Sequence, residues 1–259
     1  MSLSDIAKAA IKRGVVESIS KSTVNRVLSS AAIKPWQYHS WLFPMAPDFL
    51  KKAEAILDLY QGIYQGRKLD EDEYVICADE KTSIQARIRL CPTLPPKEEV
   101  PIRVAHEYKR GGATNYMAGW DVFKGRLIGK CVRRKTKAAF RSLVCKIMEM
   151  EPYKSAKRVF FVVDNGSTHR PETFGTWLQE KYQSKAVAVH LPTYSSWLNQ
   201  IEIIFSVLQR KVLTPNYVGS LAELVDNIMR FEALYNAKAK PIDWNFTTDK
   251  FKDMMQKVA

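Results

Sequence analysis

Apolar and polar residues follow two different periods along the chain, and the change falls near residue 74. Before it, apolar residues recur at helical spacing over residues 2–14, 22–33 and 48–65. Gly14 is placed to end the first helix and Ser22 to cap the second. The turn-length segment between these two helices predicts a helix-turn-helix, although the same pattern also fits a plain helical hairpin.

From residue 74 onward, short apolar runs with strand character take over. Strands are expected over 74–79, 158–163 and 186–191, and a hairpin over 114–122 and 126–132, after a proline-rich loop at 91–101. Helical periodicity returns between and after them, over 136–150, 171–181, 197–212 and 221–236. Strands followed by alternating strands and helices predict an α/β fold, a mixed sheet flanked by helices on both faces.

The composition is that of a folded, basic protein. Hydrophobic residues make up 46% of the 259 residues and aromatic residues 11%, which is richer than a disordered chain. The formal net charge of +13 and the pI near 9.5 favour a polyanionic partner, because lysine and arginine release counterions from phosphate backbones. Nucleic acid is the leading candidate, and a generally basic soluble protein is the alternative.

Cysteine usage and hydropathy indicate a soluble intracellular protein with no membrane contact. The four cysteines contain no close CxxC pair, so neither a disulfide framework nor a zinc finger is predicted. The first residues lack the apolar core of a signal peptide, and no apolar run approaches the ~18 residues that span a bilayer.

Three carboxylates stand at positions that call for a partner. Asp79 and Asp164 each follow a short apolar strand, and strand ends border the ligand crevice of open α/β sheets. Glu202 lies at the edge of a helical apolar stripe, so its carboxylate is expected near the core. Alternatively, an aspartate after a strand is a common turn residue, and a glutamate suits the first turn of a helix.

Together, the three carboxylates predict a site for hard cations. Carboxylate and water ligands suit Mg²⁺ or Mn²⁺, and two such ions ~4 Å apart can activate a water and stabilise the leaving oxygen of a phosphodiester. With the basic composition, this indicates phosphoryl transfer on nucleic acid.

Several segments resemble the DDE transposases, in the bacterial insertion-sequence branch related to mariner elements. The matching segments are ISKSTVNRVL with IKPW, ICADEKTSIQ, HEYKRGGATNYMAGWDVFKGRLIG, VVDNGSTHRPETFGTWL and LPTYSSWLNQIEIIFSVLQRKVL. The resemblance covers nearly the whole chain, and the last segment is the most specific. It implies a ribonuclease-H-like catalytic domain over residues 70–259, after a helix-turn-helix region at 1–33 and a linker with a connecting helix at 34–69.

The resemblance also implies a mechanism and partners. Asp79, Asp164 and Glu202 would hold two Mg²⁺ or Mn²⁺ ions. The chain would cut double-stranded DNA at terminal inverted repeats and join the freed 3′ hydroxyl to target DNA, commonly at TA dinucleotides. A homodimer or higher synaptic complex in the bacterial cytoplasm, associated with the nucleoid, is expected. Family members usually carry more helical sequence at the N-terminus, so the helix-turn-helix region is expected to be incomplete.

Further residues are candidates for supporting roles. Asn165, His169 and Asn199 match the family's motifs around the triad, although the first two could instead cap a helix. Glu80 is not expected to share an ion with Asp79, because successive strand residues point to opposite faces. The candidates for DNA contact include two basic residues expected in a glycine-rich loop, Lys109 and Arg110, and the residues Ser22, Thr23, Asn25, Arg26, Lys34, Arg133, Arg134, Lys135 and Lys137.

Two other functions share these features. A non-catalytic DNA-binding protein derived from a transposase would have the fold and the charge, although the intact acidic triad argues against it. A hydrolytic nuclease would have the same metal site and would lack only strand transfer.

Overall fold

The computed structural model describes residues 2–30 and 48–256 and divides the chain into two compact units, Met1–Phe43 and Pro44–Ala259. In the first unit, α1 (Leu3–Lys12) and α2 (Lys21–Ser30) pack together. Ala7 and Val24 are buried, as expected for the facing sides of two amphipathic helices.

The capping residue of α2 differs from the prediction. Ser20 rather than Ser22 accepts the N–H of Thr23 at its hydroxyl, at 3.1 Å. The helix therefore begins one residue before Ser22, which lies in its first turn, because Ser20 offers the same capping oxygen nearer the preceding turn.

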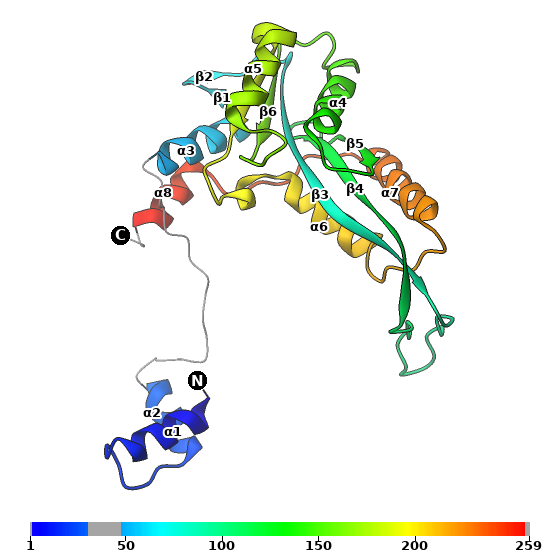
Figure 1. The fold of residues 1–259 in the computed structure, drawn as a ribbon. Helices are drawn as coiled ribbons and strands as arrows, with labels where there is room; N and C mark the ends of the chain where they lie inside the picture. The colour runs from blue at the N-terminus through cyan, green and yellow to red at the C-terminus, as the bar shows by residue number, and fades with distance from the viewer. Residues whose placement is uncertain (1, 31–47, 257–259) are drawn as a thin grey trace. The chain divides into compact units, whose positions relative to one another are not determined.

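The second unit is built on a five-stranded sheet with the strand order β5-β4-β3-β6-β7 (Figure 1). The strand β4 is antiparallel to both of its neighbours, β3 and β5, whereas β6 and β7 run parallel to β3. Their bounds are β3 (Glu73–Arg89), β4 (Tyr108–Asp121), β5 (Leu127–Val132), β6 (Arg158–Val163) and β7 (Ala186–His190). The predicted mixed sheet is confirmed.

Helices cover both faces of this sheet. One face packs on α4 (Lys137–Met148) and α5 (Pro171–Tyr182), whose buried residues share a hydrophobic core with β3 and β6. On the other face lie α6 (Ile201–Lys211) and α7 (Leu221–Asn236), where the Tyr116 hydroxyl donates to Glu232 at 2.8 Å. The two faces follow strand alternation, since Met117 belongs to the first core and Tyr116 meets α7.

The strand β3 is much longer than the six residues predicted. It continues to Arg89 and pairs with β4 as a twisted ribbon that extends beyond the rest of the sheet (Figure 1). Lys109 and Arg110 therefore lie on β4, not in a glycine-rich loop. Gly111 packs closely against Ile88, because a Cβ there would lie 2.7 Å from the Cδ1 of Ile88 and would displace the end of that side chain.

The segments at either end of this unit also differ from the prediction. The helix α3 (Phe49–Tyr60) ends earlier than expected because Gly62 has a φ of +74°, and a small hairpin of β1 (Ile63–Tyr64) and β2 (Arg67–Lys68) follows. The helix α8 (Thr248–Gln256) packs on α3. Among the described residues, no helix is both long enough and apolar enough to cross a bilayer.

Candidate active site

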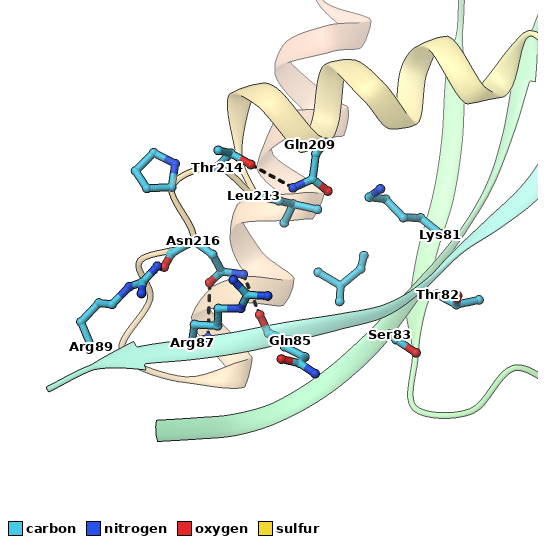
Figure 2. Close-up of a pocket in the computed structure, with 12 residues that line it drawn as sticks. Lys81, Thr82, Ser83, Gln85, Arg87, Arg89, Gln209, Leu213, Thr214 and Asn216 are labelled. Carbon is cyan, nitrogen blue, oxygen red and sulfur yellow. Dashed lines mark hydrogen bonds between the residues drawn. The ribbon is translucent and has the colours of Figure 1, made fainter. Parts of the chain in front are cut away.

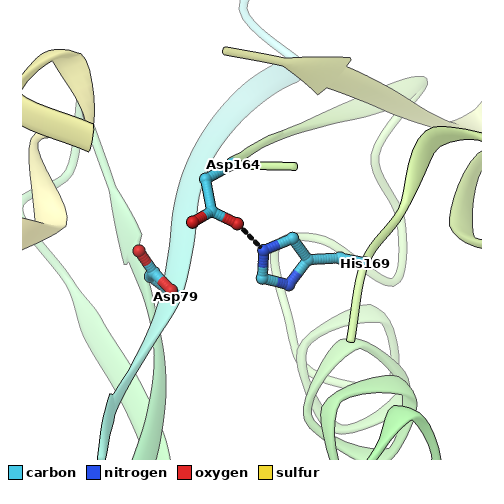
Figure 3. A group of neighbouring side chains, drawn as sticks. All are labelled: Asp79, Asp164 and His169. Atoms are coloured by element: carbon cyan, nitrogen blue, oxygen red, sulfur yellow. Dashed lines mark hydrogen bonds and ion pairs between the residues drawn. The ribbon is translucent and has the colours of Figure 1, made fainter. Parts of the chain in front are cut away.

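The parallel pairing of β3 with β6 brings the two predicted aspartates together. The last paired residues of these strands are Cys77 and Val162, and Asp79 and Asp164 each lie two residues further on. Their carboxylates face each other across a short gap (Figure 3). One ligand atom from each of Asp79, Asp164 and His169 lies within 4.8 Å of the others. The sheet register thus creates a compact acidic site.

A fully buried histidine holds the second aspartate in place. The Nε2 of His169 hydrogen-bonds the Oδ1 of Asp164, and the same oxygen accepts the N–H of Gly166 at 2.6 Å. The other carboxylate oxygen is turned toward Asp79 (Figure 3). The Oδ1 of Asp79 accepts the N–H of Glu80 at 2.7 Å. Each aspartate therefore has one oxygen fixed by the protein and another available to a ligand.

The two aspartates have pKa values displaced in opposite directions. Burial raises the pKa of Asp79 from 3.8 to about 7, and the charge of Asp164 adds to the shift. Burial also acts to raise the pKa of Asp164, but the hydrogen bond and charge of His169 outweigh it, and this pKa lies below its ordinary value. At neutral pH the site resists taking up the second negative charge, so a bound cation would stabilise it.

The third predicted carboxylate is carried by α6. Glu202 lies half-buried in the first turn of α6, beside the helix's buried residues Ile201, Ile204, Phe205 and Leu208. Burial raises the pKa of Glu202; the charge of Lys81 opposes this, and that of Asp164 adds to it. The Glu202 side chain is thus close enough to interact electrostatically with Asp164, while lying outside the compact group of Asp79, Asp164 and His169.

Asn199 joins the start of α6 to the strand that carries Asp79. Its buried side chain donates from Nδ2 to the carbonyl of Ala78 at 3.3 Å. A second bond holds the segment just before α6: the hydroxyl of Tyr60, at the end of α3, donates to the carbonyl of Leu198 at 2.8 Å. These bonds set the position of the Glu202 helix relative to Asp79. The motif match alone gave Asn199 no physical role.

Replacing Asn199 with alanine is expected to lower the free energy of unfolding by about 1–2 kcal/mol, because the buried carbonyl of Ala78 loses a donor. Urea denaturation of the whole chain measures this change. Asn245→Ala removes the same amide from an exposed position and is expected to change stability by less than about 0.5 kcal/mol. Equal stabilities of the two variants would contradict the bridging role.

A second buried network lies on the other face of β3, around Glu80. The sequence predicted only that Glu80 would not share an ion with Asp79. The Glu80 carboxylate accepts the hydroxyl of Thr168 at 2.9 Å and pairs with the ammonium of Lys135. The Thr168 hydroxyl also lies 3.0 Å from the Nδ1 of His169. Glu80 therefore supports His169 from behind. In the sequence, only the position of Thr168 next to His169 indicated that Thr168 could contact the histidine.

The remaining candidates lie at varied positions. Asn165 donates to the carbonyl of Leu191 at 2.8 Å and so fixes the loop after β7. Lys34 is outside the described residues. Lys135 is engaged with Glu80, and Thr23 is half-buried beside Ser20. The other DNA-contact candidates are exposed, namely Ser22, Asn25, Arg26, Lys109, Arg110, Arg133, Arg134 and Lys137.

Comparison with solved structures finds the same fold in mariner transposases at low sequence identity. The Mos1 mariner paired-end complex with Mn matches with a TM-score of 0.56 at 12% identity, covering 100% of this chain and 71% of that one. A pre-cleavage Mos1 transpososome matches with a TM-score of 0.55 at 12% identity, with the same coverage. These likenesses establish the ribonuclease-H-like fold.

Sequence comparison gives the family. The insertion element IS630 uncharacterized 39 kDa protein of Shigella sonnei is 27% identical over 97 residues, which are 38% of this chain and 27% of that protein. This chain therefore matches only about a quarter of that relative's length. The sequence model described as DDE superfamily endonuclease matches residues 74–225, from the start of β3 into α7, and includes all three predicted carboxylates. The chain belongs to the DDE superfamily endonuclease family.

Proposed function

We propose that this chain is a metal-dependent DNA transposase that cuts at the ends of an insertion element and joins the freed 3′ hydroxyl to target DNA. The observation that carries this proposal is the pair of facing carboxylates on β3 and after β6, with Glu202 in electrostatic range. Family membership supports it, as does the fold shared with the Mos1 paired-end and strand-transfer complexes.

The donor set fits divalent cations. Asp79 and Asp164 direct carboxylate oxygens into one gap, and hard cations such as Mg²⁺ and Mn²⁺ prefer oxygen ligands. Among the described residues, no lysine or arginine forms an ion pair with Asp79. We propose that these two aspartates and Glu202 hold two ions, which when bound would lower the pKa of a water and stabilise the leaving oxygen.

The protein's own groups would orient this site. His169 and Gly166 fix one oxygen of Asp164, and the Glu80 N–H fixes one oxygen of Asp79. Because one oxygen of each carboxylate is held, the orientation of the other oxygen is also set, so little side-chain motion is needed when a ligand binds. Water would attack in cleavage and the DNA 3′ hydroxyl in joining, and neither step needs a covalent protein intermediate.

The finer parts of the proposal come from the family resemblance. The DNA substrates are double-stranded terminal inverted repeats and a target with a TA dinucleotide. The active form is a homodimer or a higher synaptic complex in the bacterial cytoplasm. The helices α1 and α2 would read the repeats through the exposed residues Ser22, Asn25 and Arg26.

Incubation of the purified chain with supercoiled plasmid and Mn²⁺ or Mg²⁺ tests the proposal. We expect metal-dependent nicks and joined products, which Glu202→Gln removes because it deletes a metal-binding charge. Glu172→Gln is the matched control, since Glu172 is an exposed first-turn glutamate of α5. Cleavage by Glu202→Gln at the wild-type rate would overturn the assignment of the triad.

The product pattern separates the alternatives. Nicked plasmid without joined products would indicate a hydrolytic nuclease. Binding that weakens with salt, without any product, would indicate a DNA-binding protein that has lost catalysis.

A further inference from the structure

A cationic groove lies along β3, beyond the acidic site. It is open on one side and is bounded by β3, the end of α6 and the loop that follows α6 (Figure 2). Twelve residues line it, and none is acidic: Lys81, Thr82, Ser83, Ile84, Gln85, Arg87, Arg89, Gln209, Leu213, Thr214, Pro215 and Asn216. The lining thus combines three cations with neutral polar groups.

None of the three cations forms an ion pair among the described residues, and Arg89 donates instead to backbone carbonyls, including that of Ala105 at 2.9 Å. Lys81 and Arg87 form no ion pair and no side-chain hydrogen bond within the part of the chain that the structure describes. The Arg87 guanidinium lies over the ring of Tyr108, 5.0 Å from its centroid, and the residue remains exposed. A groove that carries positive charge and no acidic lining residue attracts an anionic ligand.

The groove is held in shape by its own hydrogen bonds. Asn216 accepts the N–H of Arg87 at 3.3 Å and donates to the carbonyl of Gln85 at 2.6 Å, which fixes the loop to β3. Gln209 donates to the Thr214 hydroxyl at 2.9 Å, which fixes the same loop to α6 (Figure 2). The walls of the groove are therefore set before any ligand binds, which reduces the ordering cost of binding.

The groove begins at the acidic site. Lys81 lies two residues after Asp79 on β3, and its charge opposes the rise that burial causes in the pKa of Glu202. From Lys81 the lining follows β3 outward to Arg89. A strand that presents one of its phosphates to the carboxylates can continue along this line of positive charge.

We propose that the groove binds the sugar-phosphate backbone of a DNA strand where it leaves the acidic site, with Lys81 and Arg87 as the phosphate contacts. This rests on the proposed function, because it assigns a path to the DNA on which the carboxylates act. The groove follows β3 from Lys81 to Arg89 and is open on one side, which suits a continuous backbone, and neutral groups such as Gln85 and Thr82 can hydrogen-bond phosphate or sugar without reading sequence.

The salt dependence of DNA affinity tests the groove. In EDTA, we expect Arg87→Gln to reduce the slope of log K against log salt by about 0.9 for a duplex, and Lys81→Gln to do the same. The loss of affinity between 50 and 200 mM salt then becomes about three- to fourfold smaller than in the wild type. Arg87→Lys keeps the charge and should restore the slope.

Lys68→Gln is the matched control, because it removes one exposed positive charge on β2 and Lys68 does not line the groove. Equal slopes for Arg87→Gln and Lys68→Gln, with the thermal midpoints unchanged, would overturn the groove. The groove would also be overturned if Arg87→Gln weakened the binding of inorganic phosphate and left DNA affinity unchanged. If the wild-type chain cuts plasmid but Arg87→Gln leaves the salt dependence of DNA affinity unchanged, only the groove is rejected. If the wild-type chain neither binds nor cuts DNA, the proposed function itself is rejected.

Discussion

Replacing Asp79 with asparagine is expected to stabilise the folded chain by up to about 4 kcal/mol at pH 8 in EDTA. Folding raises the pKa of this carboxyl from 3.8 to about 7, chiefly through burial and then through the charge of Asp164. Each pKa unit corresponds to about 1.36 kcal/mol. Above pH 7 the folded state must hold a buried charge that the unfolded state exposes to water, and the amide removes that penalty.

The sign of this effect gives its pH window. A folded-state pKa above the unfolded value means that the native chain binds more protons, so ionisation of Asp79 lowers stability as the pH rises from about 4 to about 7. The gain from Asp79→Asn should therefore be near zero at pH 4 and complete by pH 8. Urea denaturation of wild type and variant across this range measures it.

Two controls make the result specific to the site. Asp243→Asn changes an exposed aspartate and should shift stability by less than about 0.5 kcal/mol at every pH. Adding Mn²⁺ should stabilise the wild type at pH 8 and leave Asp79→Asn nearly unchanged, because the bound cation relieves the same charge. A pH-independent difference between wild type and Asp79→Asn would contradict the electrostatic account.

Asp164→Asn is expected to reduce DNA cleavage by about 10³-fold or more while leaving DNA affinity equal or higher. The amide keeps the shape of the side chain and an oxygen that can accept from Gly166, so the fold should persist. It removes a metal-binding charge, which supplies several kcal/mol to the transition state, and it relieves repulsion of phosphate. Plasmid nicking with Mn²⁺ and titration of a labelled duplex in EDTA measure the two quantities.

Asp249→Asn serves as the control, since Asp249 is an aspartate in the first turn of α8, outside the acidic site. It should leave both cleavage and affinity unchanged. Cleavage by Asp164→Asn at the control's rate would remove Asp164 from the catalytic group. A large loss of DNA affinity would instead indicate that Asp164 contributes to the fold of the DNA-binding surface.

The carboxylates were found in the sequence because local patterns marked them. Asp79 and Asp164 end apolar runs that became β3 and β6, and the bounds of β6 and α7 are those that periodicity predicted. The half-buried place of Glu202 beside a buried stripe also followed from the helical period alone. Such patterns are local consequences of backbone geometry, so they can be predicted without tertiary contacts.

The outer half of β3 was not predicted because its stability is not local. The polar run from Glu80 to Ser83 interrupts the apolar pattern, and the residues beyond this run pair with β4 alone. The glycines after Arg110 indicated a loop, because glycine is rare in strands unless a neighbouring strand packs closely. In the folded chain, Gly111 makes room for Ile88 on the paired strand. The cationic groove is lined by this part of β3, so it could not be predicted from the sequence.

The sequence by itself determined most of the sheet strands and flanking helices and which carboxylates end or border them, because side-chain period sets these features. Tertiary structure decided the site. The register of Cys77 with Val162 sets Asp79 beside Asp164, and the bond from Asn199 to Ala78 brings Glu202 to the same edge. These contacts join residues far apart in the chain, and their geometry comes from packing whole elements together, which no local pattern specifies.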